Sequence, residues 1–129
     1  MKKLVEDWLF FAERDLKTAE KIIKDDEPFT NIIAFHCQQA IEKYLKAYLI
    51  SNNIPLKKTH DLILLNNMVN EIKDLAIDYN KIIMVNEIYT ETRYPGEFGL
   101  LPDGLPSVEQ AQEFIDFANE IKSIITKEI

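Results

Sequence analysis

The stretch AFHCQQAIEKYLKAYL has helical periodicity, and its polar side chains gather on one side of the expected helix. At about 100 degrees per residue, that side carries His36, Gln39, Lys43 and Lys46. Three potential cations around one amide could bind a phosphate group. The pattern is more commonly that of a solvated helix face, on which Glu42 and Lys46 form an (i, i+4) ion pair. These residues alone leave both interpretations open.

A second polar group lies in the stretch PLKKTHDL. Lys57 and Lys58 come just before an expected helix start, where backbone amides point outward and can hold an anion. Thr59 is the expected N-cap, and Asp61 suits the positive end of the helix dipole in the first turn. In the structural alternative this stretch only begins a helix, with His60 as an exposed or capping residue.

A third group lies on the helix that precedes the stretch RYP. On a helical wheel, Asn86 and Arg93 share the apolar side with Tyr79 and Ile82. Burying the two polar side chains unpaired would be costly, so we expect them to have partners. Arg93 also ends the helix, where a cation suits the dipole. A structural role and a role at a cleft or subunit interface both remain possible.

The connection RYPGEFGLLPDGLP holds all three glycines of the chain and is nevertheless apolar. Long apolar loops in compact domains are usually functional or covered. This loop either folds back over the end of the helices or binds a partner. The candidate partner or interface residues are Asn86, Tyr94, Phe98, Leu100 and Leu101.

The elements that must position these residues are all helical, because apolar residues recur at three- and four-residue spacing and no segment alternates like a strand. The helices are expected at about 4–24, 29–52, 60–70, 73–93 and 107–127, and Ser107 with Gln110 forms a capping box at the last of them. Four of them have similar lengths. We therefore predict an all-α fold, an antiparallel up-and-down four-helix bundle with one additional short helix, in a single domain over residues 1–129.

Composition restricts the possible functions. A net charge of −7 argues against general binding to DNA or RNA, so any nucleotide site must be a local basic patch. A chain of 129 residues needs neither a metal nor a disulfide to fold, and we expect no cofactor. The single cysteine, Cys37, is expected to be buried, in a reducing, cytoplasmic setting. No apolar run is long enough for a membrane span.

Taken together, AERDLKTAE, AFHCQQAIEKYLKAYL, KTHDL and TRYP resemble the HEPN family, the higher eukaryotes and prokaryotes nucleotide-binding domains. The resemblance implies a five-helix up-and-down bundle that is often a homodimer. Its prokaryotic members are frequently paired with a minimal nucleotidyltransferase. Other members are metal-independent ribonucleases, including toxins of toxin–antitoxin pairs. These enzymes carry an arginine followed closely by a histidine near the end of the fourth helix, and a dimer combines both copies in one cleft.

This sequence departs from the ribonuclease motif, because Arg93 matches the arginine but no histidine follows it. Histidine is the usual acid or base for cleaving RNA near neutral pH. We therefore expect a non-catalytic module that binds a nucleotide or RNA end for a separately encoded nucleotidyltransferase. Its expected ligand-binding residues are Arg93, Lys43, Lys46, Lys58, His60, Gln39 and His36. The alternatives are a divergent metal-independent ribonuclease and a protein-interaction module without a ligand.

Overall fold

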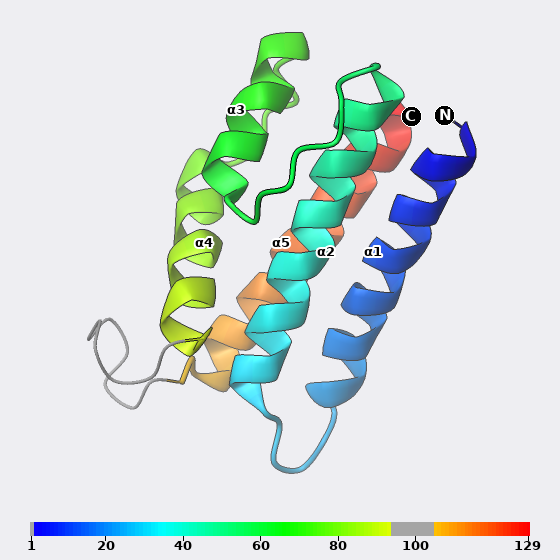
Figure 1. Ribbon diagram of the computed structural model, residues 1–129. Coiled ribbons are helices and arrows are strands. Elements are labelled where there is room, and N and C mark those ends of the chain that lie inside the picture. The colour runs from blue at the N-terminus through cyan, green and yellow to red at the C-terminus, as the bar shows by residue number, and fades with distance from the viewer. Residues whose placement is uncertain (1, 94–104) are drawn as a thin grey trace.

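The computed structural model describes residues 2–93 and 105–129, with only the backbone from 88 to 93. The described residues form five helices and no strand, which confirms the all-helical prediction. The helices are α1 (Lys2–Ile22), α2 (Thr30–Ser51), α3 (Leu62–Ile72), α4 (Tyr79–Arg93) and α5 (Val108–Glu128) (Figure 1). Their description as an antiparallel four-helix bundle with one additional helix stays a prediction. None of the described helices is both long and apolar enough to cross a membrane.

Helix α2 is the centre of the fold, because it packs against each of the other four helices and most extensively against α1 and α5 (Figure 1). Such a position requires apolar side chains on more than one face, and α2 is buried over most of its length. Cys37 lies on it and is fully buried, as expected. The largest fully buried side chains of α2 and its neighbours include Leu16, Tyr44, Leu65, Ile82, Phe114 and Phe117.

The connection between α2 and α3 positions the polar stretch KTHD. After Ser51 the chain turns through Asn53, whose φ of 64° lies in the left-handed region that asparagine tolerates. It then runs back alongside α2 (Figure 1). The Nε2 atom of Gln38 donates a 3.0 Å hydrogen bond to the backbone oxygen of His60. The connection is thereby fastened to the middle of α2.

Helix α4 begins later than expected. The prediction of a helix from residue 73 is wrong, because Ala76 has a φ of 58°, which a right-handed helix excludes. The Asp74 carboxylate accepts a hydrogen bond from the Ala76 amide, and the Asp78 carboxylate accepts one from the Lys81 amide. The first of these bonds stabilises a turn in place of a helix, and the second caps the start of α4. Tyr79, expected on the apolar side, is exposed at the start of α4.

The two predicted helix caps have different outcomes. At α5 the capping box is confirmed, since the Ser107 amide donates to Gln110 Oε1 and the Gln110 amide donates to Ser107 Oγ. At α3 the prediction of Thr59 as N-cap is wrong, because Asp61 holds that position. Thr59 instead accepts a hydrogen bond from the Asp61 amide. Thr59 therefore stabilises the turn that places Asp61 at the N-cap position of α3.

Candidate functional site

A hollow of about 410 Å³ lies between α1, α2 and the connection that follows α2. Its volume falls within the range of roughly 300–1,000 Å³ that is typical of ligand pockets. We refer to it as the lysine pocket. It is lined by Trp8, Gln39, Glu42, Lys43, Lys46, Leu56, Lys57, Lys58, Thr59 and His60. Five of the seven predicted ligand-binding residues thus line one hollow. Three of them, Gln39, Lys43 and Lys46, come from α2, and the other two, Lys58 and His60, come from the connection after it.

Glu42 binds two other side chains of the lysine pocket, Lys46 and His60. Its side chain is 4% exposed, and its Oε2 atom accepts a 2.9 Å hydrogen bond from Nζ of Lys46, which is 6% exposed. A buried carboxylate and a buried ammonium each lose hydration, and their mutual bond offsets part of that cost. The expected ion pair between Glu42 and Lys46 is present. The expectation that it lies on a solvated face is wrong, because Trp8 and the connection after α2 cover it.

His60 is held over the same carboxylate. Its Nδ1 atom lies 2.9 Å from Oε1 of Glu42, while 62% of its side chain is exposed. An ionised carboxylate only accepts hydrogen bonds, so Nδ1 carries the proton in this contact. That arrangement leaves Nε2 free to bind a ligand or exchange a proton. Glu42 therefore both pairs with Lys46 and orients the imidazole of His60.

Asp15 on α1 likewise contacts one histidine and one lysine of α2. Its Oδ1 atom lies 2.8 Å from Nδ1 of His36, and its Oδ2 atom accepts a hydrogen bond from Nζ of Lys43. Lys43 reaches the lysine pocket, whereas His36 does not line it. The predicted polar stripe of α2 is therefore divided, with His36 directed to the contact between α1 and α2.

The positive charge of the lysine pocket is concentrated in the connection after α2. Lys57 and Lys58 are exposed, and neither forms an ion pair with a carboxylate in the part of the chain that the structure describes. Lys43 and Lys46 also line the pocket, but Asp15 and Glu42 neutralise them. The pocket is consequently a local basic patch on a chain with a net charge of −7.

The backbone amides at the start of α3 do not provide an anion site, which was one of the two alternatives for this stretch. The Leu62 amide donates a 3.0 Å hydrogen bond to Oδ1 of Asn86, and the Ile63 and Leu64 amides donate to Oδ1 of Asp61. The chain itself thus satisfies the amides that would bind an anion. This agrees with the structural alternative for the stretch, and an anion in the pocket must rely on side-chain cations. Asn86 has its partner within the chain.

Some predicted residues lie outside the described side chains, and some lining residues were missed. The predictions that lie outside are those for Arg93, Tyr94, Phe98, Leu100 and Leu101. Sequence reasoning did not assign Trp8 or Glu42 to a ligand site. It considered Lys57 beside Lys58 as a cation near an anion, but the expected ligand-binding residues include only Lys58. No sequence pattern marked Trp8 or Glu42, since their roles depend on how α1 packs against α2.

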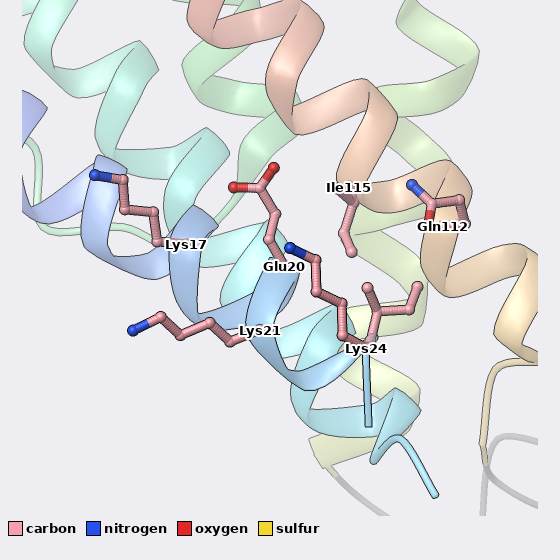
Figure 2. A pocket seen from close by; sticks show the side chains of 7 residues that line it. Lys17, Glu20, Lys21, Lys24, Gln112 and Ile115 are labelled. Carbon is pink, nitrogen blue, oxygen red and sulfur yellow. The ribbon is translucent and has the colours of Figure 1, made fainter. Parts of the chain in front are cut away.

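A second hollow, of about 340 Å³, lies between α1 and α5 and also contains lysines. Figure 2 shows Lys17 and Lys21 pointing away from Gln112 and Ile115 of α5, with the carboxylate of Glu20 among the side chains that line the hollow. None of the predicted ligand-binding residues lies there. Among residues 2–93 and 105–129, no three His, Cys, Asp or Glu side chains come together in a way that could hold a metal ion.

Comparisons with known proteins identify the family. The HEPN domain model matches residues 5–129. The crystal structure of TT1696 from Thermus thermophilus matches with a TM-score of 0.76 and 18% identity, over 97% of this chain and 98% of that one. The crystal structure of ST0689, an archaeal HEPN homologue, matches with a TM-score of 0.73 and 27% identity, over 96% of each chain. No significant match was found among curated proteins. The chain belongs to the HEPN domain family.

Proposed function

We propose that this HEPN protein binds the phosphate of a nucleotide or RNA end in the lysine pocket and presents it to a separately encoded minimal nucleotidyltransferase. The observation that carries the proposal is the pair of unneutralised ammonium groups, Lys57 and Lys58, beside a hollow of ligand size. In an acidic protein, such a patch favours a discrete anion over a long nucleic-acid track. The partner supplies the metal ion and the chemistry.

Each cation has a different part in this proposal. Lys57 and Lys58 contact the phosphate directly, because no carboxylate of the described chain competes for them. Lys43 and Lys46 line the pocket but add little net charge, since each is already bound to a carboxylate. His60 donates or accepts through Nε2 at the open side of the pocket. Arg93 contributes from the end of α4, in a homodimer whose second copy completes the site.

The sole tryptophan makes the proposal directly testable. Trp8 lines the lysine pocket, so its fluorescence should change when ribose 5-phosphate or a nucleotide binds at low salt. The double variant Lys57→Ala, Lys58→Ala should bind at least about tenfold more weakly, because two charge-assisted contacts are lost. The matched control is Lys21→Ala, Lys24→Ala in the hollow between α1 and α5, which should bind normally. Equal affinity in both double variants would reject the lysine pocket and favour the interaction-module alternative.

One observation favours a second candidate, a metal-independent ribonuclease. The hydrogen bond from His60 to Glu42 leaves Nε2 free, which is the arrangement a general base needs. His60 would remove the proton from a ribose 2′-hydroxyl and thereby replace the histidine that is missing after Arg93. The test is incubation of RNA with the protein and a chelator of divalent metals. Cleavage that His60→Ala abolishes supports this candidate, and intact RNA rejects it.

A further inference from the structure

Two of the four lysines that line the lysine pocket have no counterion among the described side chains. Lys43 and Lys46 each bind a carboxylate of the chain, so they add little net charge. Lys57 and Lys58 are exposed, and neither forms an ion pair with a described carboxylate. His60 adds a further positive charge only when its imidazole is protonated. The pocket therefore presents two uncompensated ammonium groups to a ligand.

The carboxylates beside the pocket are shielded by their own partners. Glu42 is the only acid among the described residues that line the pocket, and its side chain is 4% exposed. Its two oxygens contact Lys46 and His60. Asp15, which binds Lys43, is 13% exposed and does not line the pocket. Because neither carboxylate is open to the hollow, little repulsion opposes the attraction of Lys57 and Lys58 for an anion.

The charge of a phosphate depends on how many ester bonds it forms. A phosphomonoester carries two negative charges above its second pKa of about 6, and it stands at the end of a chain or on a mononucleotide. A phosphodiester, such as an internal linkage of RNA, carries one. A dianion compensates both Lys57 and Lys58, whereas a monoanion leaves one ammonium group without a counterion. Since attraction grows with the product of the charges, the dianion gains more in this pocket.

We infer that the lysine pocket selects a phosphomonoester dianion and discriminates against internal phosphodiesters. This inference rests on the proposed phosphate site and names the class of phosphate that the site takes. The ligand is then a mononucleotide or a phosphorylated RNA end, and the interior of an RNA chain is not retained. Lys57 and Lys58 determine this selectivity, because the other two lysines of the pocket are already neutralised. No covalent step is involved.

Calorimetric titration at pH 8 and low salt tests the inference with three matched ligands. They are adenosine 5′-monophosphate, its phosphate methyl ester and adenosine, which carry two, one and no negative charges. The monophosphate should bind at least about tenfold more tightly than the methyl ester. Lys57→Ala and Lys58→Ala, tested singly, each leave one uncompensated ammonium group and should reduce this preference to less than about threefold. Lys21→Ala removes an exposed lysine outside the pocket and should keep the full preference.

The outcomes separate this inference from the phosphate site on which it rests. If the methyl ester binds as tightly as the monophosphate, and both bind more tightly than adenosine, the phosphate site stands and the selectivity is rejected. If neither binds more tightly than adenosine, both proposals fail. A preference for the monophosphate that persists in both single variants would also overturn the inference, because Lys57 and Lys58 would not be its cause.

A second pair of ligands distinguishes the two sources of a phosphomonoester. The dinucleotide ApA has one internal phosphodiester, and pApA adds a terminal 5′-phosphate. If pApA binds as tightly as the mononucleotide and ApA binds weakly, the pocket accepts a phosphorylated RNA end. If pApA binds as weakly as ApA while the mononucleotide binds tightly, the ligand is a mononucleotide. Equal, tight binding of ApA and pApA would contradict discrimination against internal phosphodiesters.

Discussion

The Nδ1 atom of His60 lies 2.9 Å from Oε1 of Glu42, although 18 residues separate them along the chain. The contact fastens the connection after α2 to the middle of α2, and it joins an exposed imidazole to a buried carboxylate. The other oxygen of that carboxylate binds the buried ammonium of Lys46. The same side chain therefore contributes to the shape of the candidate site and to the stability of the fold.

Removal of the Glu42 carboxylate should be strongly destabilising. Glu42→Leu leaves the Lys46 ammonium buried without its counterion, and breaking a buried pair from one side typically costs about 3–5 kcal/mol. We expect the free energy of unfolding to fall by that amount at neutral pH. Urea denaturation followed by circular dichroism measures it.

Two control variants distinguish the buried ion pair from a general effect of mutation. The double variant Glu42→Leu, Lys46→Met removes both charges, so most of the lost stability should return. Lys3→Ala breaks the exposed pair with Asp7 and should leave the free energy of unfolding nearly unchanged. A double variant as unstable as Glu42→Leu would show that lost packing, rather than an unpaired charge, causes the destabilisation.

The sequence predicted those features that depend on local pattern. Apolar periodicity revealed the five helices, and the spacing of Ser107 and Gln110 predicted their capping box. Burial of Cys37 followed from its apolar neighbours on the same helix.

The sequence pattern could not predict those features that depend on tertiary contacts. An (i, i+4) pair such as Glu42 and Lys46 looks the same in sequence whether it is exposed or buried. Its burial depends on Trp8 from α1 and on the connection that returns along α2. The late start of α4 is a different case, because Ala76 has a positive φ without the glycine that would have signalled it.

Glu13 should make stability depend on pH. Its Oε2 atom accepts hydrogen bonds from Nζ of Lys122 at 2.6 Å and from the hydroxyl of Tyr44 at 3.2 Å. The bond from Lys122 is the main cause that lowers the pKa of Glu13 below its ordinary value. A lowered pKa in the folded state stabilises the protein above the unfolded pKa of about 4.3, and this contribution is lost as pH falls through the folded value.

Glu13→Gln is therefore expected to destabilise the protein by about 0.5–1 kcal/mol at pH 7. The difference from wild type should shrink as pH falls below about 4, where the wild-type carboxylate becomes protonated. Thermal denaturation of both proteins across this range measures the effect. Glu113→Gln, on the exposed side of α5, is the control and should change stability little at any pH. A destabilisation by Glu13→Gln that is constant from pH 7 to the acid limit would contradict the ionic explanation.

Cys37 should be unreactive in the folded protein. Burial, with a smaller contribution from the negative charges of Glu20 and Asp15, raises the pKa of its thiol to about 12. The nucleophilic thiolate is thus nearly absent at pH 8, and the sulfur is also inaccessible. Modification by a disulfide reagent should proceed only through unfolding and accelerate in urea in step with the unfolded population. Rapid modification without denaturant would mean that α2 opens locally.

Asn66 offers a way to stabilise the protein. Its side chain on α3 is fully buried, and neither Oδ1 nor Nδ2 has a hydrogen-bond partner within the described chain. A buried amide without partners costs about 1–3 kcal/mol, so Asn66→Leu, which has a similar shape, should raise the free energy of unfolding by about that amount. The matched control is Asn67→Leu at the exposed neighbouring position, which should change stability by less than about 0.5 kcal/mol. Loss of stability in Asn66→Leu, with Asn67→Leu unchanged, would indicate that the amide hydrogen-bonds a buried water molecule.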